Sequence, residues 1–360
     1  MVNKEFWRGK KVLITGHTGF KGAWLSLWLR HLSAKVMGFS LPPPTIPSLF
    51  ELTSLRDVID SIEGDVRDLD LLKKVVGAHR PEIVIHMAGQ ALVLRSYVDP
   101  IETYSTNIMG TVNVLEVIRQ IGGVRVVIII TSDKCYDNRE WIWGYREFDP
   151  LGGLDPYSSS KGSAELVTTA FRHSFFNPLE FDRHGVGVAS VRAGNVIGGG
   201  DWAEGRLVPD IMKAIRENRV IKIRNPDSYR PWQHVLEPLR GYLMLAEKLY
   251  NHGPDYAEAW NFGSNSLDLR PVVWILEKIA EVWGPGVQWE LEEKKQPHEA
   301  RFLNLDCSKA KMRLGWEPKL DLEQVLNWTV SWYKTFQNDP VTIKKFTESQ
   351  IIDYAKLFNE

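Results

Sequence analysis

Short apolar runs alternate with longer amphipathic stretches through the first half of the chain. Apolar runs of this length, bounded by polar residues, are typical of buried strands in a parallel sheet. Such strands are predicted at Val12–Thr15, Lys35–Phe39, Ile83–Met87, Val124–Thr131 and Val186–Val191. Helices are predicted between them, near Lys21–Leu32, Asp68–Ala78, Thr103–Gln120 and Ser158–Ser174. This alternation predicts an α/β fold with a doubly wound parallel sheet.

The pattern changes after about Arg192. A glycine-rich, polar stretch follows, with Gly194, Gly198–Gly200 and Gly205, and the later elements are shorter and mixed. We therefore predict a sheet domain over residues 1–192 and a smaller, mixed α/β domain over residues 193–360 that supplies substrate contacts. Chains of this type often cross back, so later segments are expected to rejoin the first domain.

Composition excludes several classes of function. The 44 Lys and Arg residues almost balance the 45 Asp and Glu residues, so no bulk charge favours nucleic acid or an anionic membrane. The two cysteines, Cys135 and Cys307, are far apart, which indicates a reducing compartment without disulfides. The first residues carry charges with no long apolar stretch behind them, unlike a signal peptide. The sequence therefore predicts a soluble, cytoplasmic protein.

The loop after the first predicted strand has the spacing Gly-x-x-Gly-x-x-Gly and opens a helix. Glycines there permit a tight turn and a close approach of the backbone to a pyrophosphate, which the helix N-terminus attracts. An ordinary glycine-rich turn could show the same spacing, but the position directly after the first strand favours a dinucleotide site. We predict a Rossmann-type domain that binds NAD, with contacts from Gly16, Thr18, Gly19, Phe20, Lys21 and Gly22.

Further cofactor contacts are predicted at the carboxyl ends of later strands. Asp65-Val66 follows a short third strand and could bond and pack an adenine, and the small residues of Ala88-Gly89-Gln90 let a cofactor cross the sheet edge. The second strand ends at Ser40, without the acidic residue that usually holds the NAD ribose. No arginine follows to receive the phosphate of NADP, so NAD is the predicted cofactor. Other predicted cofactor contacts are Thr106, Thr131, Tyr157, Lys161 and Ala193.

Tyr157 and Lys161 are one helical turn apart and share a face. A free tyrosine has a pKa near 10, so it accepts a proton at neutral pH only if its phenolate is stabilised, for example by an adjacent ammonium. Tyr-x-x-x-Lys also occurs by chance in helices, but here it follows a fifth strand that ends Thr131-Ser132. The chain resembles the extended branch of the short-chain dehydrogenase/reductase superfamily, which acts on nucleotide sugars.

The triplet Ser132-Asp133-Lys134 narrows the chemistry that this resemblance implies. In sugar-nucleotide 4,6-dehydratases the corresponding triplet is Thr-Asp-Glu, in which Asp protonates the departing C6 hydroxyl and Glu removes the C5 proton. Lys134 replaces that Glu, and a lysine acts as a base only if burial or a neighbouring cation lowers its pKa by several units. The alternative for Asp133-Lys134 is a solvated turn. Whether Lys134 is the C5 base stays open.

Long segments resemble the CDP-glucose 4,6-dehydratase family, including the lysine of the triplet. They are Thr15–Trp28, Thr131–Asn138, Trp143–Glu147, Val191–Trp202, Arg230–Val235 and Pro297–Ala300. The resemblance implies a hydro-lyase that converts CDP-glucose to CDP-4-dehydro-6-deoxyglucose and water by hydride transfer through bound NAD, in deoxysugar biosynthesis of the lipopolysaccharide O-antigen type. The catalytic residues it implies are Ser132, Asp133, Lys134, Tyr157 and Lys161.

A nucleoside diphosphate needs convergent cations, and arginine is preferred for its forked donors. Arg206, Arg230 and Arg301 are the candidates, although each taken alone is more often a surface residue. The resemblance implies that Asn195 donates to a phosphate, and His234 could line the pocket. No residue in the sequence can be assigned to reading cytosine, and no metal site is predicted.

Two other functions are weighed against the dehydratase. A nucleotide-sugar 4-epimerase shares the Ser, Tyr, Lys and NAD but needs no elimination, and Asp133 argues against it because epimerases tend to have small neutral residues there. A non-catalytic dinucleotide sensor characteristically lacks the Tyr-Lys pair. The apolar helices near Thr103–Gln120 and Ser158–Ser174 suit the four-helix dimer interface of the superfamily, so a homodimer or a tetramer is expected.

Overall fold

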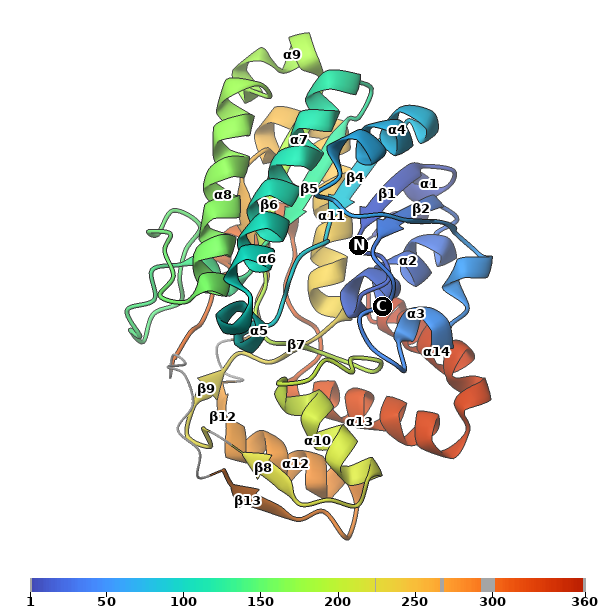
Figure 1. Ribbon diagram of the computed structural model, residues 1–360, viewed down its shortest axis with the longest axis vertical. Coiled ribbons are helices and arrows are strands. Elements are labelled where there is room, and N and C mark those ends of the chain that lie inside the picture. The colour runs from blue at the N-terminus through green and yellow to red at the C-terminus, as the bar shows by residue number, and fades with distance from the viewer. Residues whose placement is uncertain (1, 224, 266–268, 293–301, 359–360) are drawn as a thin grey trace.

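The computed structural model describes residues 2–223, 225–265, 269–292 and 302–358 (Figure 1). Its core is a seven-stranded parallel sheet with the order β11-β6-β5-β4-β1-β2-β3. The strands are β1 (Lys11–Thr15), β2 (Lys35–Ser40), β3 (Asp60–Glu63), β4 (Ile83–His86), β5 (Val126–Ile130), β6 (Gly187–Arg192) and β11 (Ala259–Asn261). The five strands predicted from apolar runs all lie in this sheet, and the predicted α/β fold is confirmed.

The chain reverses its direction of travel across the sheet between β1 and β4. From β1 it moves outward to β2 and β3, then returns to β4 and continues to β5 and β6 on the other side. Thr15, the last residue of β1, is in register with Phe39 on one side and His86 on the other. Open α/β sheets bind ligands at the carboxyl ends of the strands at such a switch point.

Helices cover both faces of the sheet, because successive strand residues point to opposite sides. Leu13 of β1 packs in the core beneath α4, α7 and α8, whereas Val12 and Ile14 pack in the larger core that contains α2 and α11. The covering helices are α2 (Phe20–His31), α4 (Leu69–His79), α7 (Gly110–Ile121), α8 (Pro156–Ser174) and α11 (Leu236–His252).

The helix predicted near Thr103–Gln120 is interrupted. The structure contains α6 (Pro100–Tyr104), a π-helical turn (Ser105–Met109) and then α7. Inside the turn, Asn107 donates to Gln90 O at 3.0 Å and to Ser160 Oγ at 2.8 Å. These inward bonds account for the irregularity, and π-turns of this kind are frequent at functional sites.

Elements after residue 193 fall into two groups. β11 and α11 belong to the main sheet and its covering layer. Among the described residues, three short strand pairs lie outside it: β7 (Val196–Ile197) with β10 (Gln233–His234), β8 (Ile221–Ile223) with β13 (Trp289–Leu291), and β9 (Tyr229–Arg230) with β12 (Arg270–Pro271). Figure 1 shows α10, α12, β8 and β13 grouped at the end of the molecule opposite α9. The division at residue 193 stays a prediction.

The remaining helices are α1 (Lys4–Trp7), α3 (Leu49–Leu52), α5 (Val93–Val98), α9 (Phe181–His184), α10 (Leu207–Arg216), α12 (Val272–Trp283), α13 (Leu322–Asn338) and α14 (Ile343–Lys356). The last helix, α14, packs against α2 on one face of the sheet. There Tyr354 lies edge-on to Trp28 of α2, with ring centroids 5.8 Å apart. Within the described ranges, no helix combines the length and apolar character that crossing a bilayer would need.

Candidate active site

Glycines shape the loop between β1 and α2 where other residues would not fit. Gly16 has a φ of +78°, and a Cβ there would lie 2.7 Å from the backbone nitrogen of Ala88. A Cβ at Gly22 would lie 2.2 Å from Gly16 O. The first turn of α2, which is described throughout, contains no acidic residue, and Gly19 before it provides no side-chain cap. The free N–H groups and the close backbone approach therefore fit the pyrophosphate of a dinucleotide.

Thr18 and Ser40, both predicted cofactor contacts, bond to each other at the end of β2. Their hydroxyl oxygens are 2.8 Å apart, and Thr18 Oγ1 donates to Leu41 O at 2.9 Å. Since Thr18 uses its proton for Leu41, Ser40 donates to Thr18. The pair ties the glycine loop to β2, and its contacts with a cofactor stay a prediction.

His17 is a loop residue that the sequence reasoning did not assign. Its ring lies over β2, where a Cβ at Gly38 would come within 2.2 Å of it, and its Nε2 is 2.7 Å from Ser61 Oγ. Burial, assisted by the charge of Arg56, lowers the pKa of His17 to about 4, so the ring is neutral at neutral pH. Gly38 was the available signal, because a glycine inside a strand often marks the close approach of another group.

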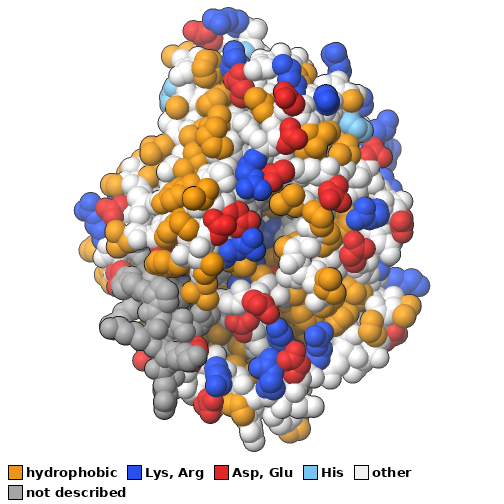
Figure 2. Space-filling model, viewed as in Figure 1, with side chains coloured by type: hydrophobic (Ala, Val, Ile, Leu, Met, Phe, Trp, Pro, Cys, Tyr) orange, Lys and Arg blue, Asp and Glu red, His pale blue; other side chains and the backbone are white. Residues whose placement is uncertain are grey.

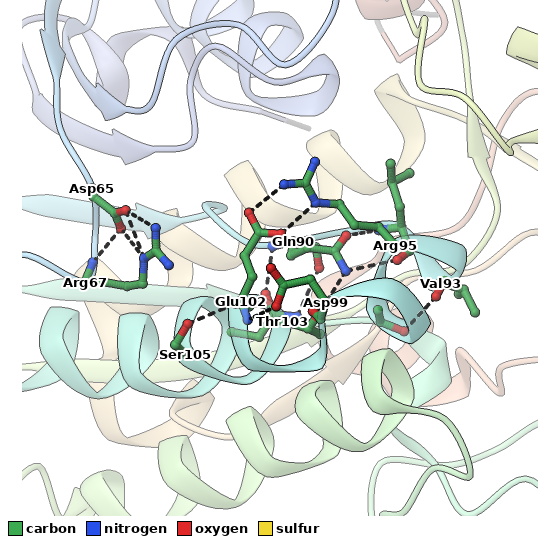
Figure 3. A network of polar contacts seen from close by, with 12 residues as sticks. Asp65, Arg67, Gln90, Val93, Arg95, Asp99, Glu102, Thr103 and Ser105 are labelled. Carbon is green, nitrogen blue, oxygen red and sulfur yellow. Dashed lines mark hydrogen bonds and ion pairs between the residues drawn. The ribbon is translucent and has the colours of Figure 1, made fainter.

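Asp65 lies directly after β3, and Figure 3 shows its carboxylate turned toward Arg67. Its Oδ1 accepts the backbone N–H of Arg67 at 2.8 Å, and its Oδ2 is 2.5 Å from the guanidinium Nη2. The Arg67 guanidinium holds the pKa of Asp65 below its ordinary value. Val66 is buried in the core beneath α4 and α7. The contact of either residue with an adenine stays a prediction.

The loop after β4 runs beside Lys161. Gln90 donates its backbone N–H to Asn107 Oδ1 at 2.9 Å. Its side-chain Nε2 donates to Thr103 Oγ1 at 2.9 Å (Figure 3). A Cβ at Gly89 would lie 2.9 Å from Asn107 Oδ1 and 3.2 Å from Lys161 Nζ. The small residue predicted at this strand end therefore leaves room for the lysine side chain itself.

Tyr157 lies in the first turn of α8, close to the end of β5. Asp155 accepts an N–H of that turn at 2.9 Å, and Pro156 begins the helix, a combination that starts helices efficiently. Burial raises the pKa of Tyr157 to about 12, while the neighbouring Ser132 side chain and the Arg206 charge act in the opposite direction. Substrate and cofactor must therefore supply further stabilisation of a phenolate.

Lys161 follows one turn later on the same face of α8. Its Nζ donates to Ile130 O, at the end of β5, at 3.4 Å. Burial lowers the pKa of Lys161 to about 8, while Cys135 and Glu165 act to raise it. The side chain is therefore still predominantly an ammonium at neutral pH, as support of a neighbouring phenolate requires.

Ser132 caps a short 3-10 helix (Asp133–Cys135) that follows β5 and begins with Asp133. Ser132 Oγ donates to Asp133 Oδ1 at 2.9 Å. The Asp133 side chain is buried, and its Oδ2 has no hydrogen-bond partner among the described residues. A Cβ at Gly194 would lie only 1.9 Å from this oxygen, so a glycine there is needed to admit the carboxylate. An unpaired buried carboxylate oxygen is costly and is typical of a group kept for a ligand.

Thr131 and Lys134 flank the Ser132-Asp133 segment. The Thr131 hydroxyl donates to Glu165 Oε1 at 2.5 Å and also faces Val191 O at 3.1 Å. Its proton is therefore used inside the protein, and Ser132 provides the hydroxyl beside Tyr157. Lys134 is half-buried on the short helix next to Asp133.

Lys21, Arg206 and Lys161 are close enough for the charges of Arg206 and Lys161 to act on Lys21, on which Asp133 also acts. Arg206, the residue before α10, bonds Asp201 Oδ2 through Nη1 at 2.9 Å. Burial lowers the pKa of Lys21 to about 7, assisted by Arg206 and Lys161, while Asp133 and Asp201 act to raise it. Lys21 was predicted only as a cofactor contact. Its proximity to Asp133 was not predicted, because it depends on the fold bringing α2 close to the end of β5.

The remaining predicted ligand contacts lie in different surroundings. His234 is fully buried, with its ring edge-on to Trp24 and Trp328, and its contact with a ligand stays a prediction. Arg230 is buried in β9, and Asn195 follows β6 with a φ of +44°. Arg301 lies outside the described residues. The predicted contacts of Thr106, Ala193, Asn195, Arg206 and Arg230 with ligands stay predictions.

Comparison with known proteins places these features in context. The model of the family described as GDP-mannose 4,6 dehydratase matches residues 13–329. A curated CDP-glucose 4,6-dehydratase of Salmonella typhimurium is 56% identical over 336 residues, covering 93% of this chain and 94% of that protein. The dTDP-glucose 4,6-dehydratase of Bacillus anthracis, solved in complex with NAD, has a TM-score of 0.75 at 22% identity, covering 92% of this chain and 98% of that one. The UDP-glucose 4-epimerase of Thermotoga maritima has a TM-score of 0.76 at 24% identity, covering 90% and 98%.

Proposed function

The chain belongs to the GDP-mannose 4,6-dehydratase family, and we propose that it is an NAD-dependent CDP-glucose 4,6-dehydratase. The observation that carries this proposal is the buried Asp133 carboxylate beside the Ser132–Tyr157 pair, in a chain 56% identical to a curated enzyme of that activity. The reaction converts CDP-glucose to CDP-4-dehydro-6-deoxyglucose and water. It supplies a deoxysugar precursor of the kind used in lipopolysaccharide O-antigen synthesis.

Oxidation at C4 is the first step assigned to these residues. The Tyr157 hydroxyl, once ionised, takes the proton of the C4 hydroxyl, and Ser132 holds the C4 oxygen by a hydrogen bond. The Lys161 ammonium, one turn away on the same helix face, stabilises the phenolate. NAD, when bound, would supply reversible hydride chemistry, with the hydride taken from C4 and given to C6 within one turnover, so that no external reductant would be consumed. The glycine loop before α2 would hold its pyrophosphate.

Elimination of water is the step that separates a dehydratase from an epimerase. A ketone at C4 acidifies the hydrogen at C5, and loss of that proton expels the C6 oxygen when an acid protonates it. Asp133 is the proposed acid, because its carboxylate is buried beside Ser132 and has an oxygen free for substrate. Lys134 as the C5 base stays a prediction. A proton is returned to C5 at the end of the cycle.

A turnover screen tests the proposed function. The purified protein is incubated with NAD and with CDP-, dTDP-, GDP- or UDP-glucose in deuterated water. We expect a 4-keto-6-deoxy product that has lost one water and carries solvent deuterium at C5, with CDP-glucose the preferred substrate. Formation of a C4 epimer without deuterium at C5 would support the epimerase instead. Absence of the keto product with every nucleotide would contradict the dehydratase.

Exposed apolar side chains at the helices α6, α7 and α8 fit an interface with a second copy of the chain. Ile101 on α6, Met109 before α7, and Leu166 and Phe175 at α8 are exposed apolar side chains, and Figure 2 shows hydrophobic side chains along this side of the molecule. Apolar patches of this kind mark interaction sites. We expect light scattering to give twice the chain mass or a multiple of it, and Leu166→Glu to lower it. A monomeric wild type would contradict the homodimer.

A further inference from the structure

Glu165 is a buried carboxylate on the catalytic face of α8 that the proposed mechanism does not use. It lies one turn beyond Lys161, as Lys161 lies one turn beyond Tyr157. Its Oε1 accepts the Thr131 hydroxyl at 2.5 Å, and its Oε2 accepts Ser190 Oγ at 2.7 Å. The carboxylate therefore joins the catalytic helix to the ends of β5 and β6.

Arg192 is the charged partner of this carboxylate. Its Nη2 donates to Glu165 Oε2 at 2.8 Å, and the two side chains are 3% and 0% exposed. On the far side, Nη1 donates to Tyr136 Oη at 2.7 Å and to Glu147 O at 3.0 Å. Desolvation makes such buried pairs poor sources of stability, so a role in geometry or electrostatics accounts for them better.

The pair reaches the Ser132-Asp133 segment through Thr131. Thr131 directly precedes Ser132 and Asp133, and its backbone N–H donates to Val191 O at 2.9 Å. With its hydroxyl on Glu165, the residue is held at both its backbone and its side chain. The position from which Ser132 reaches Tyr157 is therefore set from inside the protein.

The same carboxylate is the negative charge that faces Lys161. The titratable groups that act on or with this lysine are Lys21 from α2, His86 from β4, Cys135 from the short helix and Glu165 from α8. Burial lowers the pKa of His86 to about 3 and raises the pKa of the Cys135 thiol, so both are neutral near pH 7. Arg192, by contrast, contacts Glu165 from the side that faces Tyr136.

We propose that Glu165 and Arg192 form a positioning pair for the catalytic centre. Glu165 holds Thr131, and with it the Ser132-Asp133 segment, while its negative charge maintains the positive charge of Lys161. Arg192 fixes the carboxylate and balances its charge from behind. This inference rests on the proposed function, because the roles of Asp133 and Lys161 come from that reaction.

Removing the charge of Glu165 in one variant and that of Arg192 in another tests the proposed electrostatic effect on Lys161. The protein is labelled with lysine carrying 13C at Cε, and the resonance that Lys161→Arg removes is titrated without substrate. In Glu165→Gln the midpoint of Lys161 is expected to fall by about one pH unit, because the ammonium loses its carboxylate. In Arg192→Met it is expected to rise, because the carboxylate loses its balancing charge. Glu116→Gln, at a partly exposed carboxylate on α7 that pairs with Arg119, is the control and is expected to leave the midpoint in place.

Thr131→Val tests the positioning part, because it keeps the side-chain shape and removes only the hydroxyl. We expect kcat for CDP-glucose to fall about tenfold with KM little changed, while the Lys161 midpoint stays at the wild-type value. Thr131→Ser restores the donor and is expected to recover most of kcat. Thermal unfolding and circular dichroism establish that each variant is folded.

The electrostatic role, the positioning role and the proposed function can each be refuted separately. Midpoints of Lys161 that move in the same direction in both charge variants, or do not move in the folded Glu165→Gln protein, contradict the electrostatic role, and equal kcat in Thr131→Val and wild type contradicts the positioning role. If Arg192→Met does not fold, Glu165→Gln and Thr131→Val still decide the matter. A wild type that turns over no nucleotide sugar refutes the proposed function, whereas the substrate-free titration judges the pair by itself.

Discussion

Asp133→Asn is expected to stop the reaction after the sugar has been oxidised. Asparagine fills the same space and can still bond Ser132, but it has no proton to deliver to the departing C6 oxygen. We expect elimination to slow by about a hundredfold to ten-thousandfold, the range that general acid catalysis contributes. In a stopped-flow experiment with CDP-glucose, absorbance of the reduced cofactor should appear at a near wild-type rate and then persist instead of decaying.

A steric variant provides an independent route to the same carboxylate. In Gly194→Ala the new Cβ would lie 1.9 Å from Asp133 Oδ2, so the side chain must move and elimination should slow in the same way. Gly77→Ala is the matched control, because its Cβ meets only Ile121 Cδ1 at 3.8 Å among the described residues. If oxidation and elimination decline equally in Asp133→Asn, the assignment of Asp133 as the acid is wrong.

Tyr157→Phe is expected to abolish the oxidation step itself. The phenyl ring keeps the packing of the first turn of α8 but leaves the C4 hydroxyl without a proton acceptor. We expect the single-turnover rate of hydride transfer to fall by about a thousandfold or more, near the upper part of the range for proton-transfer catalysis. The measurement is the absorbance of the reduced cofactor when excess enzyme is mixed with CDP-glucose.

The control for this prediction is another tyrosine hydroxyl outside the site. Tyr256 donates to Arg313 O at 3.4 Å in an exposed position, so Tyr256→Phe should leave hydride transfer unchanged. Calorimetric binding of CDP-glucose to Tyr157→Phe would show that the substrate site is intact. Hydride transfer at more than about a tenth of the wild-type rate in Tyr157→Phe would refute its role as the base.

The main sheet could be predicted from sequence because each of its long strands is a local apolar run. Val124–Thr131 was predicted where the structure has β5 at Val126–Ile130, and the loop glycines follow β1 as expected. β11 was not predicted, because a three-residue strand has too little pattern and its place depends on β6. The π-turn at Asn107 was missed for a similar reason, since Gln90 and Ser160 come from distant parts of the chain.

The candidate site also has a part that could be predicted from sequence and a part that could not. Ser132, Asp133, Tyr157 and Lys161 were predictable because their spacing lies within two local elements. The Glu165–Arg192 pair and the space at Gly194 were not, because each depends on a contact between elements far apart in sequence. The packing of His234 against Trp24 and Trp328 was likewise not predictable, and its place in a substrate pocket stays a prediction.

The arrangement of side chains around α8 limits how this protein can change in length. Tyr157, Lys161 and Glu165 recur every four residues on the inner side, and Leu166 lies on the exposed side. Because each helical residue turns the chain by about 100°, one inserted residue after Tyr157 would swing Lys161 and Glu165 out of the site together. An insertion or deletion between Tyr157 and Glu165 is therefore expected to disrupt the site, even where a substitution at the same position would not.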